Sequence, residues 1–310
     1  MAARSLTVAF RNGERLALCS RFRTATVRER ATAASRLDFL TKWEEFRGMT
    51  TLCCTVRDCL LPLTREGRRL VCARAHSFDI ARSGYINLLQ PQDRRSKEPG
   101  DAPEIVAARR RLHDRGVTRP LLEGVAKILG AQASDVVLEA GCGDGFYVGT
   151  LARQVGFEGA GVDISTPAID AAARRYKQCQ WIVANADRTV PYADRSFSIV
   201  MSIAARMNSQ EFARVLREGG RLLVAIPAPD DLIELRGKGR DRVQRTIETF
   251  TPAFKLVDQR RATTTADLDA DSVHDVLLSI YRPLRSEPAG AMKVTFSLDM
   301  LIFSLRSSCE

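Results

Sequence analysis

Short apolar runs alternate with longer amphipathic stretches through the middle of the chain, which predicts a repeated strand and helix pattern. The apolar runs predict strands at Val136–Ala140, Ala160–Asp163, Ser198–Ile203 and Arg221–Ile226, with a further strand just before Asn185. The amphipathic stretches predict helices at Arg119–Leu129, from about Phe146 onward, and at Asn208–Arg217. Strands that alternate with helices favour a doubly wound sheet with helices on both faces, so the expected fold class is α/β.

The pattern is weaker beyond Arg217. Glu218–Gly220 predicts a turn that leads into the strand at 221–226. Leu232–Arg236 predicts a short helix after Pro229. Two separate apolar stretches, Lys293–Leu298 and Met300–Phe303, predict a pair of closing antiparallel strands.

A glycine-rich loop, Gly141–Gly145, follows the first predicted strand. Glycines let the backbone turn sharply and approach a ligand closely. A dinucleotide fingerprint would require glycine at position 146, where this chain has Phe146. Asp163 ends the second strand, at the edge where a carboxylate can accept hydrogen bonds from ribose hydroxyls.

Glu139 before the glycine loop, Asp163 at the end of the second strand and Asn185 to Asp187 after the third form a series that is typical of methyltransferases that use S-adenosylmethionine. A nicotinamide-binding or nonenzymatic α/β domain is the alternative reading of the same pattern. The expected cofactor-binding residues lie in and around the loops after these strands. They are Glu139, Gly141, Gly143, Asp144, Gly145, Asp163, Ile164 and Asp187.

Two close pairs of potential metal ligands lie upstream of this region. Four residues separate Cys54 from Cys59, and three separate Cys72 from His76, with the strand-like segment Arg69–Cys72 between the pairs. This is close to zinc-finger spacing, because two ligand pairs on tight turns can supply the four donors of a tetrahedral site. The alternative is that the cysteines are buried apolar residues and His76 lies on the surface. Cys53 is a second candidate for the first ligand, and we expect Cys54 to be the ligand and Cys53 to be free of zinc.

Charge is distributed unevenly along the 310 residues, whose formal net charge is +10. Residues 55–120 hold fourteen Lys and Arg against eight acids, and residues 1–48 hold ten against five. The remainder of the chain is therefore close to neutral. Positive charge concentrated on a zinc module suits a nucleic-acid backbone, whereas a solvated basic face is the alternative.

The chain is long enough for one substantial domain and a small one. We expect residues 49–90 to form the zinc-binding module, 91–120 a basic connector and 121–310 the methyltransferase domain. Residues 1–48 are expected to be an unstructured extension or the product of a mis-called start, with translation from Met49; a transit peptide is the minority reading. The remaining cysteines show no pairing logic and no apolar run approaches the length of a membrane span, so we expect a cytoplasmic protein.

The segment from Cys54 to Leu121 resembles the N-terminal region of the bacterial 23S ribosomal RNA guanine-N1 methyltransferase family. The resemblance continues through the glycine loop and fades after about residue 240. The four ligands carry it together with several short motifs. These motifs are Phe78-Asp79, Gly84-Tyr85, Asn87–Leu89, Arg94–Ser96, Pro99–Asp101 and Ala108–Arg110.

The resemblance implies a Rossmann-like, seven-stranded class I methyltransferase domain preceded by a small zinc-binding module. It implies S-adenosyl-L-methionine and Zn²⁺ as cofactors, a hairpin of large-subunit ribosomal RNA as the partner, and N1 of guanine as the target. No membrane partner is expected, and the oligomeric state stays open, with a homodimer among the options.

This chain departs from the family pattern at several positions. The family places two residues between its first two cysteines, a Tyr at the position of Thr118, a His at that of Asp231, and a loop containing Pro at Ala204 and Ala205. Two other functions therefore stay open: methylation of a small molecule, and RNA binding by a zinc-containing protein with weakened catalysis.

The catalytic base has no assignment from sequence. Asp144 and Asp187 are expected at the correct edge of the sheet, although cofactor contacts are the expected role of both. The segment Ile203–Met207 lacks the Asn-Pro-Pro-aromatic arrangement of adenine-N6 enzymes and the Pro-Cys nucleophile of pyrimidine-C5 enzymes. Methylation of a ring nitrogen therefore remains open as the reaction.

Overall fold

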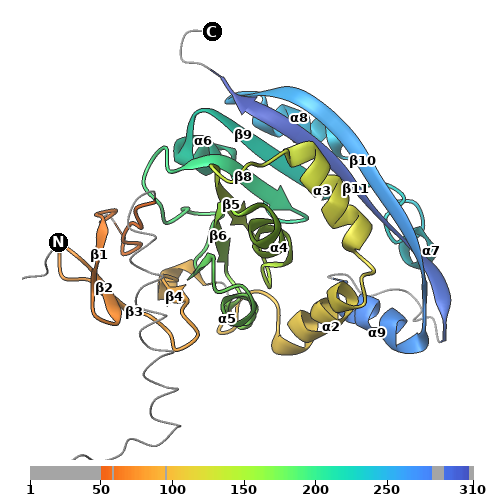
Figure 1. Cartoon of the computed structure of the whole chain (residues 1–310), viewed down its shortest axis with the longest axis horizontal. Helices are drawn as coiled ribbons and strands as arrows, with labels where there is room; N and C mark the ends of the chain where they lie inside the picture. The colour runs from red at the N-terminus through yellow and green to blue at the C-terminus, as the bar shows by residue number, and fades with distance from the viewer. Residues whose placement is uncertain (1–49, 58, 95, 281–289, 307–310) are drawn as a thin grey trace, which may run out of the picture. The chain divides into compact units, whose positions relative to one another are not determined.

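A computed structural model describes residues 50–310 except 58, 95, 281–289 and 307–310 (Figure 1). The predicted extension, residues 1–48, lies outside the described residues. Within the described residues, no helix is both long and apolar enough to cross a bilayer.

An eight-stranded sheet forms the centre of the main body, in the order β10-β11-β9-β8-β5-β6-β7-β4. Its five central parallel strands are β5 (Val136–Ala140), β6 (Glu158–Asp163), β7 (Gln180–Val183), β8 (Phe197–Ile203) and β9 (Leu216–Pro227). The long hairpin of β10 (Phe254–Leu268) and β11 (Met292–Leu305) completes one side, with β11 antiparallel to both neighbours. Seven of the strands therefore form the expected class I methyltransferase sheet, and the α/β prediction is confirmed.

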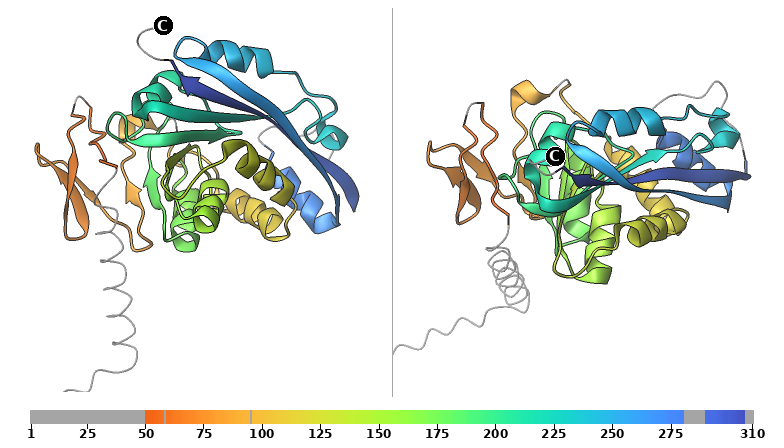
Figure 2. Two further views of the ribbon diagram at one scale, coloured as in Figure 1. Left: turned by 45° about the horizontal axis from the view of Figure 1, so that its top comes forward. Right: turned by 90° about the horizontal axis from the view of Figure 1, so that it is seen from above.

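Helices cover both faces of this sheet, as Figures 1 and 2 show. On one face lie α3 (Arg119–Leu129), α4 (Phe146–Val155) and α5 (Thr166–Arg175); α6 (Ser209–Val215) and α8 (Val243–Phe250) lie on the other. The strands between them are buried on both sides, which explains why β5 is apolar except at Glu139. The helices predicted at 119–129 and from 146 onward are confirmed.

Two predictions for the end of the chain are wrong. Glu218–Gly220, predicted as a turn, lies within β9, where the ladder with β8 shifts register and Gly219 takes a φ of 71°. The two predicted closing strands are one continuous strand, β11. The polar residue that suggested a break, Asp299, is buried and pairs with Arg261 on the neighbouring strand. The predicted segment Leu232–Arg236 contains the short helix α7 (Ile233–Arg236).

The region before α3 is joined closely to the sheet. The small antiparallel sheet β1 (Leu63–Glu66), β2 (Arg69–Cys72) and β3 (Ser77–Asp79) comes first. The next strand, β4 (Ile86–Asn87), adds an eighth strand beside β7, and a 3₁₀ turn follows at Pro91–Asp93. Helix α2 (Pro103–Asp114) then packs against α9 (Ala270–Leu278), so the expected connector contains ordered structure.

Candidate functional site

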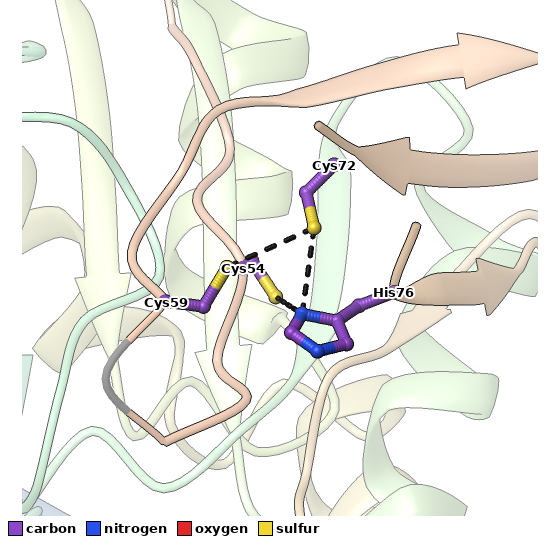
Figure 3. Close-up of side chains that lie close together, drawn as sticks. All are labelled: Cys54, Cys59, Cys72 and His76. Carbon is purple, nitrogen blue, oxygen red and sulfur yellow. Dashed lines mark hydrogen bonds between the residues drawn. The ribbon is translucent and has the colours of Figure 1, made fainter. Parts of the chain in front are cut away.

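Three thiols and one imidazole meet beside the β1–β3 sheet (Figure 3). His76 Nδ1 lies 3.4 Å from Cys54 Sγ and 3.4 Å from Cys72 Sγ, and Cys59 Sγ lies 3.7 Å from Cys72 Sγ. One ligand atom from each of the four residues lies within 4.8 Å of all the others. The structure therefore brings together the complete predicted ligand set.

The backbone places each ligand of the second pair. Cys72 is the last residue of β2, and Ala75 takes a left-handed φ of 62° in the tight turn that follows. Two hydrogen bonds close this turn, from Ala75 N to Cys72 O and from Cys72 N to His76 O. The turn returns the chain so that His76 faces Cys72.

The donor set fits a zinc ion. A tetrahedral ion with zinc–sulfur bonds of about 2.3 Å holds its ligand atoms roughly 3.7 Å apart. Three of the separations between the ligand atoms are 3.4 to 3.7 Å, close to that value, and every pair lies within 4.8 Å. The neighbouring Cys53 does not belong to this set, since its sulfur lies 4.0 Å from the carbonyl oxygen of Thr51.

The glycine loop between β5 and α4 takes a backbone conformation that side chains disfavour. Gly141, Gly143 and Gly145 have φ angles of 76°, 53° and 75°. A Cβ at Gly145 would also lie 2.3 Å from the Trp181 ring. The loop therefore needs glycine both for its dihedral angles and for packing under Trp181.

Asp163, at the end of β6, fixes the shape of this loop. Its Oδ2 accepts a hydrogen bond from Gly143 N and its Oδ1 accepts one from Ser165 N, both at 2.8 Å. Burial raises the pKa of this carboxyl, whereas the two backbone donors lower it. The next predicted residue, Ile164, packs against the hydrophobic core.

Glu139 lies at the base of the loop and is only 1% exposed. Its Oε2 accepts a hydrogen bond from Val148 N, in the first turn of α4, at 3.0 Å. Burial raises the pKa of Glu139 to about 8, helped by the nearby charges of Asp144 and Asp163. This carboxyl therefore supports the loop from beneath and has little access to a ligand.

Helix α2 brings arginine side chains to the glycine loop. Arg110 Nε lies 3.7 Å from the buried carboxylate of Asp144, and Arg109 Nη1 lies 2.6 Å from Asp101 Oδ2. Arg109 Nη1 also lies 3.5 Å from the position that a Cβ on Gly143 would take. The sequence associated these arginines with the family resemblance but gave them no role at the cofactor site. The three consecutive arginines at 109–111 are the signal that could have suggested one.

The segment after β7 carries Asn185 and Asp187. Asn185 Oδ1 accepts from Asp187 N, and its side-chain nitrogen donates to Asp93 O. The Asp187 carboxylate is 42% exposed and lies 3.3 Å from Arg206 Nε. Asp187 thus lies at the predicted edge of the sheet, paired with an arginine from the loop after β8.

A cavity of about 200 Å³ lies where the zinc module meets the segment after β7. It is lined on one side by Thr55, Arg57 and Leu60, and on the other by Asn185 and Arg188. The sequence gave no indication of this cavity, because its two sides are more than a hundred residues apart in the chain.

The two departures from the family pattern near the cofactor occupy different surroundings. Thr118 is buried, and its hydroxyl lies 2.6 Å from Nδ1 of His113, whose ring stacks on Phe146 with centroids 3.7 Å apart. Burial lowers the pKa of His113 to about 3, so the imidazole is neutral. Asp231 is half-buried just beyond the end of β9 and accepts a hydrogen bond from Ser297 N at 3.0 Å.

Comparison with known proteins gives matches over both parts of the chain. Residues 137–224 match a family described as a methyltransferase domain, and residues 53–97 match a zinc-ribbon family described as RlmA, N-terminal. The 23S rRNA (guanine(748)-N(1))-methyltransferase of Streptomyces fradiae is 36% identical over 230 residues, covering 71% of this chain and 81% of the relative. A Bacillus subtilis protein, YxjB, provisionally assigned as a 23S rRNA (guanine-N(1)-)-methyltransferase, is 34% identical over 55% of this chain and 62% of its own length. The demethylmenaquinone methyltransferase of Tropheryma whipplei strain Twist is 35% identical over 32% of this chain and 44% of its own length.

Proposed function

The chain belongs to the family of 23S rRNA guanine-N1 methyltransferases, and we propose that it transfers a methyl group from S-adenosylmethionine to N1 of a guanine in a hairpin of that RNA. One observation carries this proposal: a four-ligand zinc ribbon precedes a class I methyltransferase domain in a single chain. The catalytic domain alone would serve a small-molecule substrate equally well. The zinc ribbon favours RNA over a small molecule.

The proposed cofactor site lies at the carboxyl edge of the sheet. Asp163 would accept hydrogen bonds from the ribose hydroxyls, and the loop from Gly141 to Gly145 would offer its backbone to the rest of the cofactor. Asp187, with its exposed carboxylate, would contact the adenine side. The methyl sulfonium is the electrophile that the bound cofactor supplies, so the task of the protein is to align the base and remove its proton.

We assign two of the predicted cofactor residues a supporting role. Glu139 is almost fully buried and bonds Val148 N, and Asp144 is 5% exposed and pairs with Arg110. Both therefore hold the loop and the helices around it. Arg109, beside Gly143, is a better candidate for direct contact with a carboxylate on the ligand.

The zinc ribbon and the residues that follow it would bind RNA. Arg94 and Lys97 are exposed in the segment after the ribbon, and RNA phosphates release condensed counterions when such side chains neutralise them. The proposed domain organisation is a zinc module at 49–90, a basic connector at 91–120 and a methyltransferase domain at 121–310. Strand β4 and helix α2 tie the first two segments to the third.

The test is transfer of a labelled methyl group from S-adenosylmethionine to unmodified 23S rRNA, followed by nucleoside analysis. We expect labelled 1-methylguanosine. Label in another nucleoside would overturn the assigned target atom and keep the reaction class. No transfer to RNA, from protein shown to contain zinc and bind cofactor, would favour a small-molecule substrate.

A second measurement tests the basic segment. RNA affinity falls as the salt concentration rises. Replacing Arg94 and Lys97 together by Ala should make the plot of log affinity against log salt concentration less steep, by about 1 to 2 in slope. An unchanged slope would remove both side chains from the RNA interface.

A further inference from the structure

The segment from Ala228 to Leu232 follows the carboxyl end of β9 and is hydrogen-bonded to β11. Ala228 N donates to Ser297 O at 3.0 Å, and Leu232 N donates to Thr295 O at 2.7 Å, both acceptors lying on β11. Leu232 is buried and takes a left-handed φ of 54°, which is rare for a residue other than glycine. Strained backbone of this kind persists where the surrounding structure fixes it, and such residues are common at active sites and ligand-binding sites.

Asp231 projects from this segment with one carboxylate oxygen fixed. Its Oδ1 accepts a hydrogen bond from Ser297 N, and in the described part of the chain we find no partner for Oδ2. Burial raises the pKa of Asp231 and the charge of Asp230 adds to this, whereas the Ser297 amide, Arg236 and Arg242 lower it. A half-buried carboxylate with one anchored oxygen and one open oxygen is suited to accept a proton.

Asp231 lies at the carboxyl edge of the sheet that also carries the glycine loop, because β5 and β9 are parallel strands separated by β8. The charges of Glu139 and Asp231, after burial itself, raise the pKa of the Tyr147 hydroxyl. Tyr147 is the second residue of α4, directly after the glycine loop. Asp231 and the loop that would hold the methyl donor therefore lie at the same edge of the sheet.

The other carboxylates at this edge have structural roles or proposed contacts with the cofactor. Asp163 bonds two backbone amides with its two oxygens, and Glu139 is buried beneath the loop. Asp144 and Asp187 each lie beside an arginine. Among these carboxylates, Asp231 is neither buried beneath the loop nor, in the described part of the chain, within ion-pair distance of an arginine, and one backbone amide anchors one of its oxygens.

We propose that Asp231 is the catalytic base that removes the N1 proton of the target guanine. This inference rests on the proposed function. The N1–H proton passes to Oδ2 of Asp231, N1 forms a bond to the methyl carbon, and the carbon–sulfur bond breaks with its electron pair on sulfur. The carboxylic acid then returns its proton to solvent.

Asp231→Asn tests this role with little disturbance of the fold, because the amide oxygen of Asn can still accept from Ser297 N. We expect the rate of methyl transfer at pH 7 to fall about 10²- to 10⁴-fold. Dissociation constants for S-adenosylmethionine and for the RNA should stay within about threefold of wild type. Asp230→Asn, one residue away and 4.0 Å from Arg261, is the matched control and should keep the wild-type rate.

The dependence of rate on pH distinguishes a base from a positioning residue. Without Asp231, removal of the N1 proton falls to hydroxide in solution, so the residual rate of Asp231→Asn should keep rising by about tenfold per pH unit through neutral pH. The wild-type rate should level off once Asp231 is ionised. Asp231→His, whose imidazole can also accept a proton, should recover part of the lost rate.

Two failures can be told apart. If wild-type protein forms no 1-methylguanosine, the proposed function fails and the role of Asp231 falls with it. If wild type forms 1-methylguanosine and Asp231→Asn does so within about threefold of the same rate, the proposed function stands and Asp231 is not the base. A loss of rate in Asp231→Asn with a pH profile parallel to wild type would also overturn the assignment.

Discussion

Arg261 and Asp299 occupy directly paired positions on β10 and β11 and form a two-pronged ion pair. Arg261 Nε lies 2.7 Å from Asp299 Oδ1, and Nη2 lies 2.9 Å from Oδ2. The Asp299 side chain is 3% exposed, whereas that of Arg261 is 44% exposed. Because the Asp299 carboxylate is buried in the middle of the strand, the Arg261 guanidinium replaces the hydrogen bonds that water would otherwise donate to it.

Asp299→Asn should lower the free energy of unfolding by about 2 kcal/mol, because it removes a charge-assisted pair from a buried position. Denaturant unfolding of wild type and Asp299→Asn measures this difference in the free energy of unfolding. Asp267→Asn is the matched control in the same hairpin: Asp267 pairs with Lys293 at 4.0 Å, and both side chains are largely exposed. We expect the control to change stability by less than about 0.5 kcal/mol. Equal losses in the two variants would contradict a special role for the Asp299 pair.

The same pair shows where sequence patterns stop being informative. The central strands were predictable, because burial on both faces leaves an apolar run with few interruptions. Asp299 interrupts such a run and suggested two strands, since its partner lies 38 residues earlier in the chain. Strand β10 was not predicted at all, because polar residues fill most of its exposed positions, with Val257 as an exception.

The candidate site likewise has one part that the sequence predicts and another part that only the structure shows. The zinc ligands are close together in sequence, so their spacing alone indicated which side chains would meet. Glu139 and Asp144 were predicted as cofactor contacts from their place beside the loop, and only the structure shows that their carboxylates are buried. Arg109 reaches the loop from a helix that precedes it by one complete helix and strand, and spacing cannot reveal that approach.

Cys72→Ser should remove zinc from the protein. Three remaining ligands bind a structural zinc ion poorly, so metal content measured by mass spectrometry should fall from about one ion per chain to nearly none. Cys53→Ser is the control, because the Cys53 sulfur lies outside the ligand cluster and its loss should leave zinc content unchanged. Zinc loss in Cys53→Ser would mean that the first ligand is misassigned.

Asp163→Ala should weaken binding of S-adenosylmethionine by about 30-fold or more, measured by calorimetry. The change removes a proposed ribose acceptor and also frees Gly143 N and Ser165 N, each of which loses a charge-assisted hydrogen bond. Asp170→Asn serves as the control, since Asp170 lies nearby in α5 and its side-chain partners within the described residues are Arg174 and Ser83. Wild-type affinity in Asp163→Ala would exclude this residue from the cofactor site.

Glu139 should make the protein less stable as pH rises. Its pKa is raised by burial from an ordinary value of 4.5 to about 8, so the folded protein holds this proton more tightly than the unfolded chain does. The resulting stability is complete below about pH 4.5 and is lost as pH rises toward 8, where the buried carboxyl must ionise. Glu139→Gln stays neutral at every pH, and its amide oxygen can still accept from Val148 N.

Unfolding by denaturant at pH 5, 6.5 and 8 separates this contribution from that of other groups. We expect Glu139→Gln and wild type to differ little at pH 5, and the variant to be more stable by an amount on the order of 3 kcal/mol at pH 8. Glu123→Gln on α3 is the control, because the Glu123 side chain is 67% exposed and should show no such divergence. Curves for Glu139→Gln and wild type that stay parallel from pH 5 to 8 would mean that Glu139 is already ionised in the folded protein. Its carboxylate would then have to be stabilised by donors beyond Val148 N, and the group beneath the cofactor loop would be charged.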